Sequence, residues 1–301
     1  MSKKTFQRVI NEYFGNANSD AVAMEKAIIV ENFFSLIRDN KKEEIESILK
    51  RTPDALYYVN NLRQTTLHTA CRYNRPEILS LFLEKLPKNI RSADRFIDKR
   101  DTEGFTALMV CADNNCPECA KMLMEHKPNL QIVGYDLKRN VAHLAAQKNA
   151  HEILSMVLSV KTKGGKVALD VNEPCQDREY YGFTAAHFSA SNFAHKSIRV
   201  LKNFSADFNA QALKNKTPLM IALQSGSQEV VSYLLEQSEI DLMLRDTTGH
   251  LAYHYALLYR APKKYVKQIK SMIEKQFQIE NPRPLSKHRL NVKRLTSEHT
   301  K

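Results

Sequence analysis

A six-residue motif that recurs along the chain constrains the fold more than any other feature. It reads TTLHTA at residues 65–70 and TPLMIA at residues 217–222. Weaker copies begin at Thr106, Asn140, Thr184 and Leu251, so successive starts lie 41, 34, 44, 33 and 34 residues apart. Self-similarity at a period of about 20 to 50 residues is typical of repeat proteins, in which each unit packs only on its neighbours. The sequence therefore predicts one elongated array of repeats.

Each unit is predicted to contain two helices. The motif starts with threonine in four of its six copies, and a hydroxyl there can accept a hydrogen bond from a backbone N–H in the first helical turn. Segments 77–83 and 229–235 follow two of the copies and carry apolar residues at helical rather than alternating spacing. A second motif closes the unit, as in SADFN at residues 205–209.

These two motifs, in this order, resemble those of the ankyrin-repeat family, whose signature is T-P-L-H-x-A at a period of about 33 residues. The resemblance covers residues 28–280 and implies an all-α solenoid of about seven helix-turn-helix units with finger loops. The two long intervals predict enlarged loops around residues 87–95 and 162–166. Residues 1–27 are expected to form a helical extension, and residues 281–301 a flexible basic tail.

The positive charge is concentrated at the C-terminal end. The formal net charge is +12, yet residues 260–301 hold 12 basic and 3 acidic residues, which gives +9 and leaves only +3 for the other 259 residues. Clustered lysine and arginine attract phosphate groups. One alternative function is therefore contact with anionic lipid or nucleic acid through residues 260–301.

Several features bear on the compartment. The sequence has no apolar run near the ~20 residues that a bilayer span requires, and no apolar core follows its first basic residues. Five cysteines, an odd number, fit a reducing compartment. We expect a cytoplasmic monomer. The composition suits either a bacterial effector delivered into a host cell or a eukaryotic adaptor.

Four histidines occupy the same place in four copies of the motif, namely His68, His143, His187 and His254. The repeats lie too far apart for these residues to share one zinc ion, whose ligands lie about 2 Å from the metal. The resemblance implies instead that each histidine makes hydrogen bonds to the backbone between neighbouring units.

The cysteines offer a second candidate chemistry. Cys116 and Cys119 form a CxxC motif that could bind zinc or take part in redox chemistry, but Cys119 aligns with a buried position of the repeat, where cysteine acts as a small apolar residue. An enzyme built from Cys71 with His68, or from Cys175 with His187, is a third class of function, and no flanking hydrolase motif supports it. We predict no catalytic residue, cofactor or metal.

The resemblance also implies a binding surface for a partner protein, made of finger tips and of the exposed ends of the first helices. The residues that match this surface are Arg63, Arg72, Tyr73, Glu103, Phe105, Asp113, Asn114, Arg139, Gln147, Lys148, Tyr180, Tyr181, Lys214, Lys216, Gln224 and Tyr259. Exposed aromatic residues are typical interface anchors, which favours Tyr180 and Tyr181. The alternative is that one of these tyrosines packs on the adjacent finger. The predicted function is a non-catalytic adaptor that binds another protein.

Overall fold

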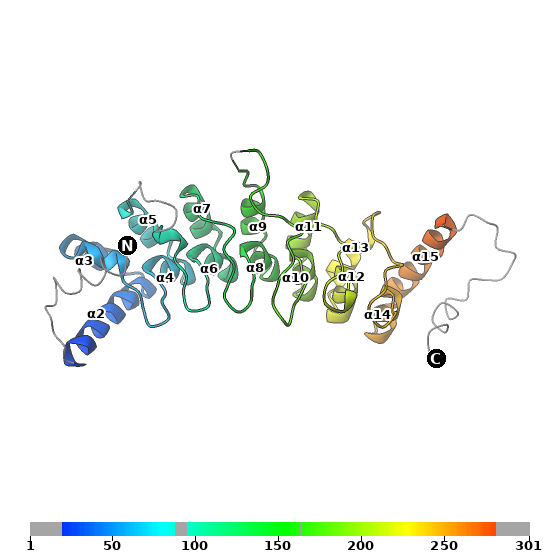
Figure 1. Ribbon diagram of the computed structural model, residues 1–301, viewed down its shortest axis with the longest axis horizontal. Helices are drawn as coiled ribbons and strands as arrows, with labels where there is room; N and C mark the ends of the chain where they lie inside the picture. The colour runs from blue at the N-terminus through cyan, green and yellow to red at the C-terminus, as the bar shows by residue number, and fades with distance from the viewer. Residues whose placement is uncertain (1–19, 88–94, 163, 281–301) are drawn as a thin grey trace. The chain divides into compact units, whose positions relative to one another are not determined.

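The computed structural model describes residues 20–87, 95–162 and 164–280 (Figure 1). The chain divides into two compact units, residues 1–136 and 137–301, called here the N-terminal unit and the C-terminal unit. Within the described residues the helices pair into seven helical hairpins, three in the N-terminal unit and four in the C-terminal unit. This number matches the expectation from the sequence.

The N-terminal unit contains two layers of helices. Its helices are α2 (Asp20–Arg38), α3 (Lys42–Arg51), α4 (Thr66–Arg72), α5 (Pro76–Lys85), α6 (Ala107–Asn114) and α7 (Pro117–Glu125), and its loops hold the short 3-10 helices η1 (Pro53–Tyr57) and η3 (Phe96–Asp98). The first helices α2, α4 and α6 pack side by side. The second helices α5 and α7 form the other layer.

The C-terminal unit repeats this arrangement four times. Its helices are α8 (Val141–Gln147), α9 (His151–Leu158), α10 (Ala185–Ser191), α11 (His195–Asn203), α12 (Pro218–Ser225), α13 (Gln228–Leu235), α14 (Ala252–Leu258) and α15 (Lys263–Glu280), and η4 (Leu213–Asn215) lies in a finger. The first helices α8, α10, α12 and α14 pack in one layer. The second helices α9, α11, α13 and α15 pack in the other.

The recurring motif forms the start of the first helices α4, α6, α8, α10, α12 and α14. Thr106 and Thr217 accept hydrogen bonds from the backbone N–H groups of Met109 and Met220, at 3.3 and 3.4 Å. Asn140 takes the same role and accepts from the N–H of His143 at 3.0 Å. Each bond satisfies an N–H group that has no partner inside its helix. In the copies that begin with threonine or asparagine, the first residue of the motif thus serves as the helix cap.

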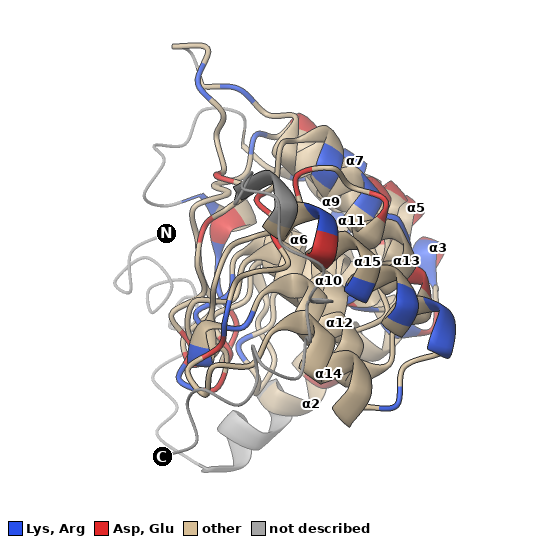
Figure 2. Cartoon of the chain, turned by 90° about the vertical axis from the view of Figure 1, so that its right-hand side faces the viewer, with Lys and Arg blue, Asp and Glu red and all other residues tan. Residues whose placement is uncertain are grey.

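The first helices of the C-terminal unit are uncharged. Their sequences, VAHLAAQ, AAHFSAS, PLMIALQS and AYHYALL, contain no lysine, arginine, aspartate or glutamate. In Figure 2 the helices α10, α12 and α14 are accordingly tan, and blue and red fall on second helices and loops. The small alanines allow close packing in this layer. Charged groups for recognition in this unit therefore come from its loops and second helices.

Of the two enlarged loops and two terminal segments expected from the sequence, the structure describes only some. Residues 160–162 pair with residues 166–168 as a short hairpin, in which Lys161 pairs with Val167 and the N–H of Thr162 donates to the carbonyl of Lys166 at 2.7 Å. The other enlarged loop, for the most part, and the predicted tail at 281–301 lie outside the described residues, as do residues 1–19. Helix α2 begins at Asp20 and so continues across the predicted boundary at residue 27. No described helix is long and apolar enough to cross a membrane.

Candidate functional site

The motif histidines connect neighbouring repeats within each unit. The ring Nε2 atoms of His68, His143 and His187 lie 2.9, 2.8 and 3.0 Å from the backbone carbonyls of Phe105, Glu173 and Lys216. In each case Nδ1 accepts a hydrogen bond from the backbone N–H at the start of the same motif, at 3.2 Å. Both nitrogens are therefore occupied by the repeat itself.

Burial keeps these histidines neutral. It lowers the pKa of both His143 and His187 to about 4, because an imidazolium would lose its hydration inside the repeat. The Cys–His pairs considered from the sequence do not offer a free base, since His68 and His187 use both nitrogens. Burial also raises the pKa of Cys71 and Cys175. The local chemistry of these residues is structural.

The five cysteines are all buried and free of disulfides. Cys119 Sγ lies 3.7 Å from the side-chain oxygen of Asn74, and Cys116 Sγ lies 3.5 Å from the carbonyl of Asn114. In the part of the chain that the structure describes, no group of three or more histidine, cysteine, aspartate or glutamate side chains is arranged to hold a metal ion.

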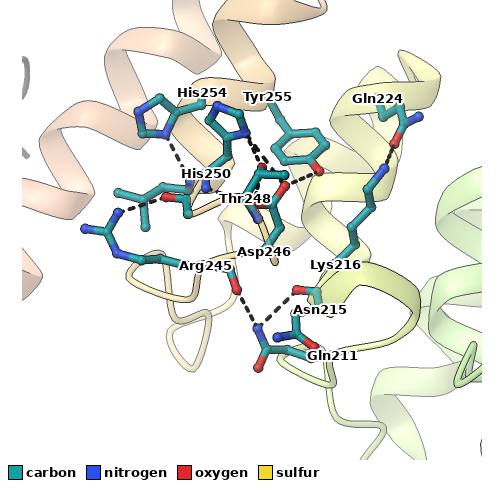
Figure 3. Close-up of polar contacts among 12 residues, drawn as sticks. Gln211, Asn215, Lys216, Gln224, Arg245, Asp246, Thr248, His250, His254 and Tyr255 are labelled. Atoms are coloured by element: carbon teal, nitrogen blue, oxygen red, sulfur yellow. Dashed lines mark hydrogen bonds and ion pairs between the residues drawn. The ribbon is translucent and has the colours of Figure 1, made fainter. Parts of the chain in front are cut away.

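We call the loop before each motif start a finger. A hollow of about 560 Å³ opens in the C-terminal unit between its last two fingers, which precede Thr217 and Leu251, and helix α14. Figure 3 shows polar contacts around it. The lining residues are Lys214, Lys216, Asp246, Thr247, Thr248, His250, His254, Tyr255, Leu257, Leu258 and Tyr259. Three of the residues predicted from the sequence, Lys214, Lys216 and Tyr259, therefore lie around one cavity.

Asp246 fixes the shape of the last finger. Its carboxylate accepts hydrogen bonds from the N–H groups of Thr248 and His250 at 2.8 and 2.9 Å, and from the hydroxyl of Tyr255 at 2.8 Å (Figure 3). Burial raises the pKa of Asp246, but these hydrogen bonds outweigh burial and the pKa falls below its ordinary value. Asp246 is thus ionised at neutral pH, and its charge is directed into the finger.

The two lysines of the preceding finger supply positive charge to the hollow. Lys216 Nζ donates to Gln224 Oε1 at 2.7 Å and lies 5.4 Å from the centre of the Tyr255 ring. An ammonium group has three donors, so two N–H groups of Lys216 remain for a ligand after this bond. Lys214 is exposed at the finger tip, and its carbonyl accepts from the N–H of Thr247 at 3.0 Å.

Gln211 stiffens the same pair of fingers. Its side-chain amide donates to the carbonyls of Asn215 and Arg245, at 3.1 and 3.0 Å, one in each finger (Figure 3). Because the fingers are bonded to each other, the hollow is formed before a ligand arrives. Its apolar part is Leu257 and Leu258, which are 51% and 69% exposed.

Most of the other predicted binding residues lie at the surface. Arg63, Tyr73, Glu103, Asn114, Lys148, Tyr181 and Gln224 are exposed, whereas Arg72, Asp113, Gln147 and Tyr180 are half-buried. Tyr180 packs against Phe183 and Phe188 of its own repeat, with ring centres 5.2 and 5.6 Å apart. It also packs on the adjacent finger, where the Arg139 guanidinium lies 4.6 Å from its ring centre. The alternative interpretation of the tyrosine pair therefore applies to Tyr180, and Tyr181 is the exposed member at 63%.

Two predicted binding residues need correction, because the structure places both inside their fingers. Phe105 and Arg139 are each only 5% exposed. Arg139 forms an ion pair with Asp177 at 3.2 Å, donates to Gln147 at 2.9 Å, and lies 4.6 Å from the ring centre of Tyr180. Neither side chain is available for direct contact with a partner in this conformation.

Sequence reasoning missed the two leucines that form the apolar part of the hollow. Leu258 is the eighth residue of its repeat counted from the motif start, and the other five copies have a polar residue at that position, namely Arg72, Asp113, Gln147, Ser191 and Gln224. An alignment of the six copies would have revealed this exception.

Comparisons with known proteins agree with the fold. The family model for ankyrin repeats (three copies) matches residues 34–136 and 191–280. The chain is 28% identical over 159 residues to the B-cell lymphoma 3 protein homolog of Mus musculus, which covers 53% of this chain and 32% of that protein. It is 23% identical over 247 residues to the NAD-dependent deacetylase sir2B of Dictyostelium discoideum, covering 79% of this chain and 30% of the relative. The chain thus spans about a third of the length of these relatives.

Solved structures show the same fold. The crystal structure of the ankyrin repeat domain of Bcl-3 superposes with a TM-score of 0.60 at 19% identity, over 79% of this chain and 97% of the other. The human ASB11 ankyrin repeat domain gives a TM-score of 0.59 at 15% identity, over 76% and 98% of the two chains. The all-α ankyrin-repeat fold expected from the sequence is confirmed, and the chain belongs to the ankyrin-repeat family.

Proposed function

We propose that the chain is a non-catalytic adaptor that binds a partner protein on the fingers and first helices, with the hollow of the C-terminal unit as its anchor. The observation that carries this proposal is the combination of exposed Leu257 and Leu258 with the cationic groups of Lys214 and Lys216 in one cavity. Pockets that become fully desolvated on binding are typical places for the hot spots of an interface. The bonds from Gln211 and Asp246 limit the ordering cost of binding.

The experiment compares capture by matched variants. The full chain and its Lys214→Ala/Lys216→Ala variant are immobilised and exposed to cell lysate, and bound proteins are identified by mass spectrometry. The control is Lys196→Ala/Lys275→Ala, which removes the same charge from exposed positions on α11 and α15. We expect a partner that is retained by the control and lost by the finger variant. Equal capture by both variants would contradict the proposal.

A second candidate function rests on helix α15. Lys263, Lys267 and Lys270 are exposed at helical spacing on one face, whereas Ile269 and Ile273 are buried on another. This arrangement supports electrostatic contact with anionic lipid or nucleic acid while the apolar face stays packed. Binding of the chain is measured by co-sedimentation with phosphatidylserine vesicles and with a single-stranded RNA. Binding should weaken steeply with added salt and in the Lys263→Ala/Lys267→Ala/Lys270→Ala variant. Salt-insensitive or absent binding would contradict it.

The cytoplasmic location, the monomeric state and the role as a bacterial effector stay predictions from the sequence. They affect where a partner is sought, because an effector would meet host proteins. The lysate for the capture experiment should therefore be prepared from both eukaryotic and bacterial cells.

A further inference from the structure

In the internal repeats, one carbonyl of each finger is bonded to the next finger of the same unit. This carbonyl belongs to the residue three positions before the motif start. The bonds run from Thr102 N to Leu62 O (3.0 Å), from Tyr135 N to Glu103 O (2.8 Å), from Leu213 N to Tyr181 O (2.9 Å) and from Thr247 N to Lys214 O (3.0 Å). In the remaining internal repeat, the thiol of Cys175 approaches the equivalent carbonyl of Leu137 at 3.3 Å. In the last finger the equivalent carbonyl is that of Thr248, and no described residue donates to it.

The last motif histidine differs from the other three in the same way. His254 Nδ1 accepts from the N–H of Leu251 at 2.9 Å, which leaves the proton on Nε2. The other three histidines donate from Nε2 to a carbonyl of the following finger. Across the described residues, none accepts from Nε2 of His254. The last repeat therefore has a free donor, Nε2–H of His254, and a free acceptor, the carbonyl of Thr248, among the described residues. The internal repeats that carry the motif histidine bond the equivalent groups to the next finger.

The apolar contacts of the last repeat are open as well. The seventh residue of the repeat is at most 2% exposed in the five preceding copies, where it is Cys71, Ala112, Ala146, Ala190 or Leu223. Its counterpart Leu257 is 51% exposed, and Leu258 beside it is 69% exposed. Removing these exposed leucine side chains from water would favour binding. The surface at this end thus has the polar and apolar groups of an interface between repeats.

The positive charge around this surface favours an acidic ligand. Lys214, Lys216 and His250 line the hollow. The single carboxylate there, Asp246, already accepts three hydrogen bonds from its own finger and one from Tyr255 of α14. An incoming acidic side chain would meet two ammonium groups and no free carboxylate among the lining residues. A basic segment would meet the lysines without compensation.

We infer that the open end of the C-terminal unit binds an acidic loop of a partner protein, which adds to the repeat as one further finger. Two internal fingers make both of these bonds to the preceding repeat. In each, the N–H donor lies three residues before the residue whose carbonyl accepts from the histidine, as Thr102 does before Phe105 and Leu213 before Lys216. The loop accordingly donates an N–H to the carbonyl of Thr248 and accepts from Nε2 of His254 through the carbonyl three residues later. An apolar side chain of the loop covers Leu257 and Leu258.

This inference rests on the proposed adaptor function and specifies its partner. The probe is a displayed library of disulfide-closed random heptapeptides, selected on the full chain, because a closed loop resembles a finger. We expect selected loops to combine acidic with apolar residues. Selection of basic loops, or of none, would overturn the inference, whereas the adaptor function would still stand on the capture experiment with Lys214→Ala/Lys216→Ala.

Two variants test the site with little risk to the fold. Leu258→Gln installs the residue that the repeats of Gln147 and Gln224 carry naturally, and Val167→Gln is its control on an exposed valine of the 160–168 hairpin. Lys216→Glu reverses a charge in the hollow, and Lys196→Glu is its control. We expect Leu258→Gln and Lys216→Glu each to weaken loop binding at least tenfold, and the controls to leave it within twofold. Equal affinity across the four variants would place the loops elsewhere and refute the inference.

Nuclear magnetic resonance of the histidine side chains reports the bond itself. The Nε2–H protons of His68, His143 and His187 should be protected from exchange in the free chain, and that of His254 only after a selected loop is added. Protection of His254 in the free chain that disappears on deletion of residues 281–301 would mean that the chain covers its own end. Protection that disappears on dilution, with a dimer seen by light scattering, would assign the surface to a second copy. Either result overturns the inference.

Discussion

Arg139 and Lys216 occupy the same position in two repeats of the C-terminal unit, immediately before the motif start, yet their surroundings differ. Both donate to a glutamine eight residues later, Arg139 to Gln147 at 2.9 Å and Lys216 to Gln224 at 2.7 Å. The following finger gives Arg139 an ion pair with Asp177, whereas Asp246 of the last finger is bonded to Tyr255 instead.

The difference shows how one repeat position can serve structure or recognition. Arg139 has its charge neutralised inside the protein and is shielded from solvent. The ammonium group of Lys216 keeps free donors and faces a hollow. The neighbouring finger therefore decides whether the cation holds two fingers together or remains available for a partner.

The largest effect should come from the buried ion pair. Arg139→Met removes one partner and leaves Asp177 buried without compensation, which should lower the free energy of unfolding by about 3 to 5 kcal/mol. Lys216→Met, the matched change at the half-buried cation, should cost less than about 1 kcal/mol. Urea unfolding measures both. Equal destabilisation would mean that the two cations play the same role.

A second variant checks the cause of that loss. Asp177→Asn in the Arg139→Met background removes the uncompensated charge, so part of the lost stability should return. Further loss in the double variant would show that Arg139 acts through its contacts with Tyr180 and Phe188 rather than through Asp177.

Acid should destabilise the fold more through the histidines that are bonded to the next finger than through His254, which is not. The folded pKa of His143 and of His187 is about 4, below the ordinary value of 6.5, so the unfolded chain binds more protons between these values. Stability is therefore complete above pH 6.5 and falls as pH decreases toward 4, by on the order of 3 kcal/mol for each histidine. Burial also lowers the pKa of His254, without a bond to a next finger.

The measurement is urea unfolding at pH 7, 6, 5 and 4. His187→Gln should flatten the decline more than His254→Gln does, because His187 is the more deeply buried of the two. A decline that is the same for both variants and the parent would show that carboxylates rather than these histidines control acid stability.

The sequence predicted the fold because each repeat carries its own local signals. A cap such as Thr217 and a buried first helix can be recognised from neighbouring residues alone. Six of the seven helical hairpins of the described residues follow from the spacing of these signals, and the hairpin of α2 and α3 carries no copy of the motif. This part of the prediction needed no knowledge of contacts between repeats.

The candidate site was less predictable because it depends on which finger lies beside which. The burial of Arg139 requires Asp177 from the next finger, 38 residues away. The exposure of Leu257 results from its place in the last repeat, since the same position is buried in every earlier one. The local sequence resembles a repeat in all these cases, and only the neighbour changes.

The smallest effects should come from substitution of Gln147 and Gln224, which accept from Arg139 and Lys216. They test directly whether these two cations have different roles. Gln147→Ala removes an acceptor from a guanidinium that also has Asp177, so it should lower the free energy of unfolding by about 1 kcal/mol and leave partner binding unchanged. Gln224→Ala frees the half-buried ammonium of Lys216 to move, so stability should change by less than about 0.5 kcal/mol. Because Gln224 holds Lys216 in place over Tyr255, affinity for the captured partner should fall two- to threefold, or about 0.5 kcal/mol. Titration and urea unfolding of both variants decide the matter, and a stability loss that is larger for Gln224→Ala than for Gln147→Ala would reverse the assigned roles.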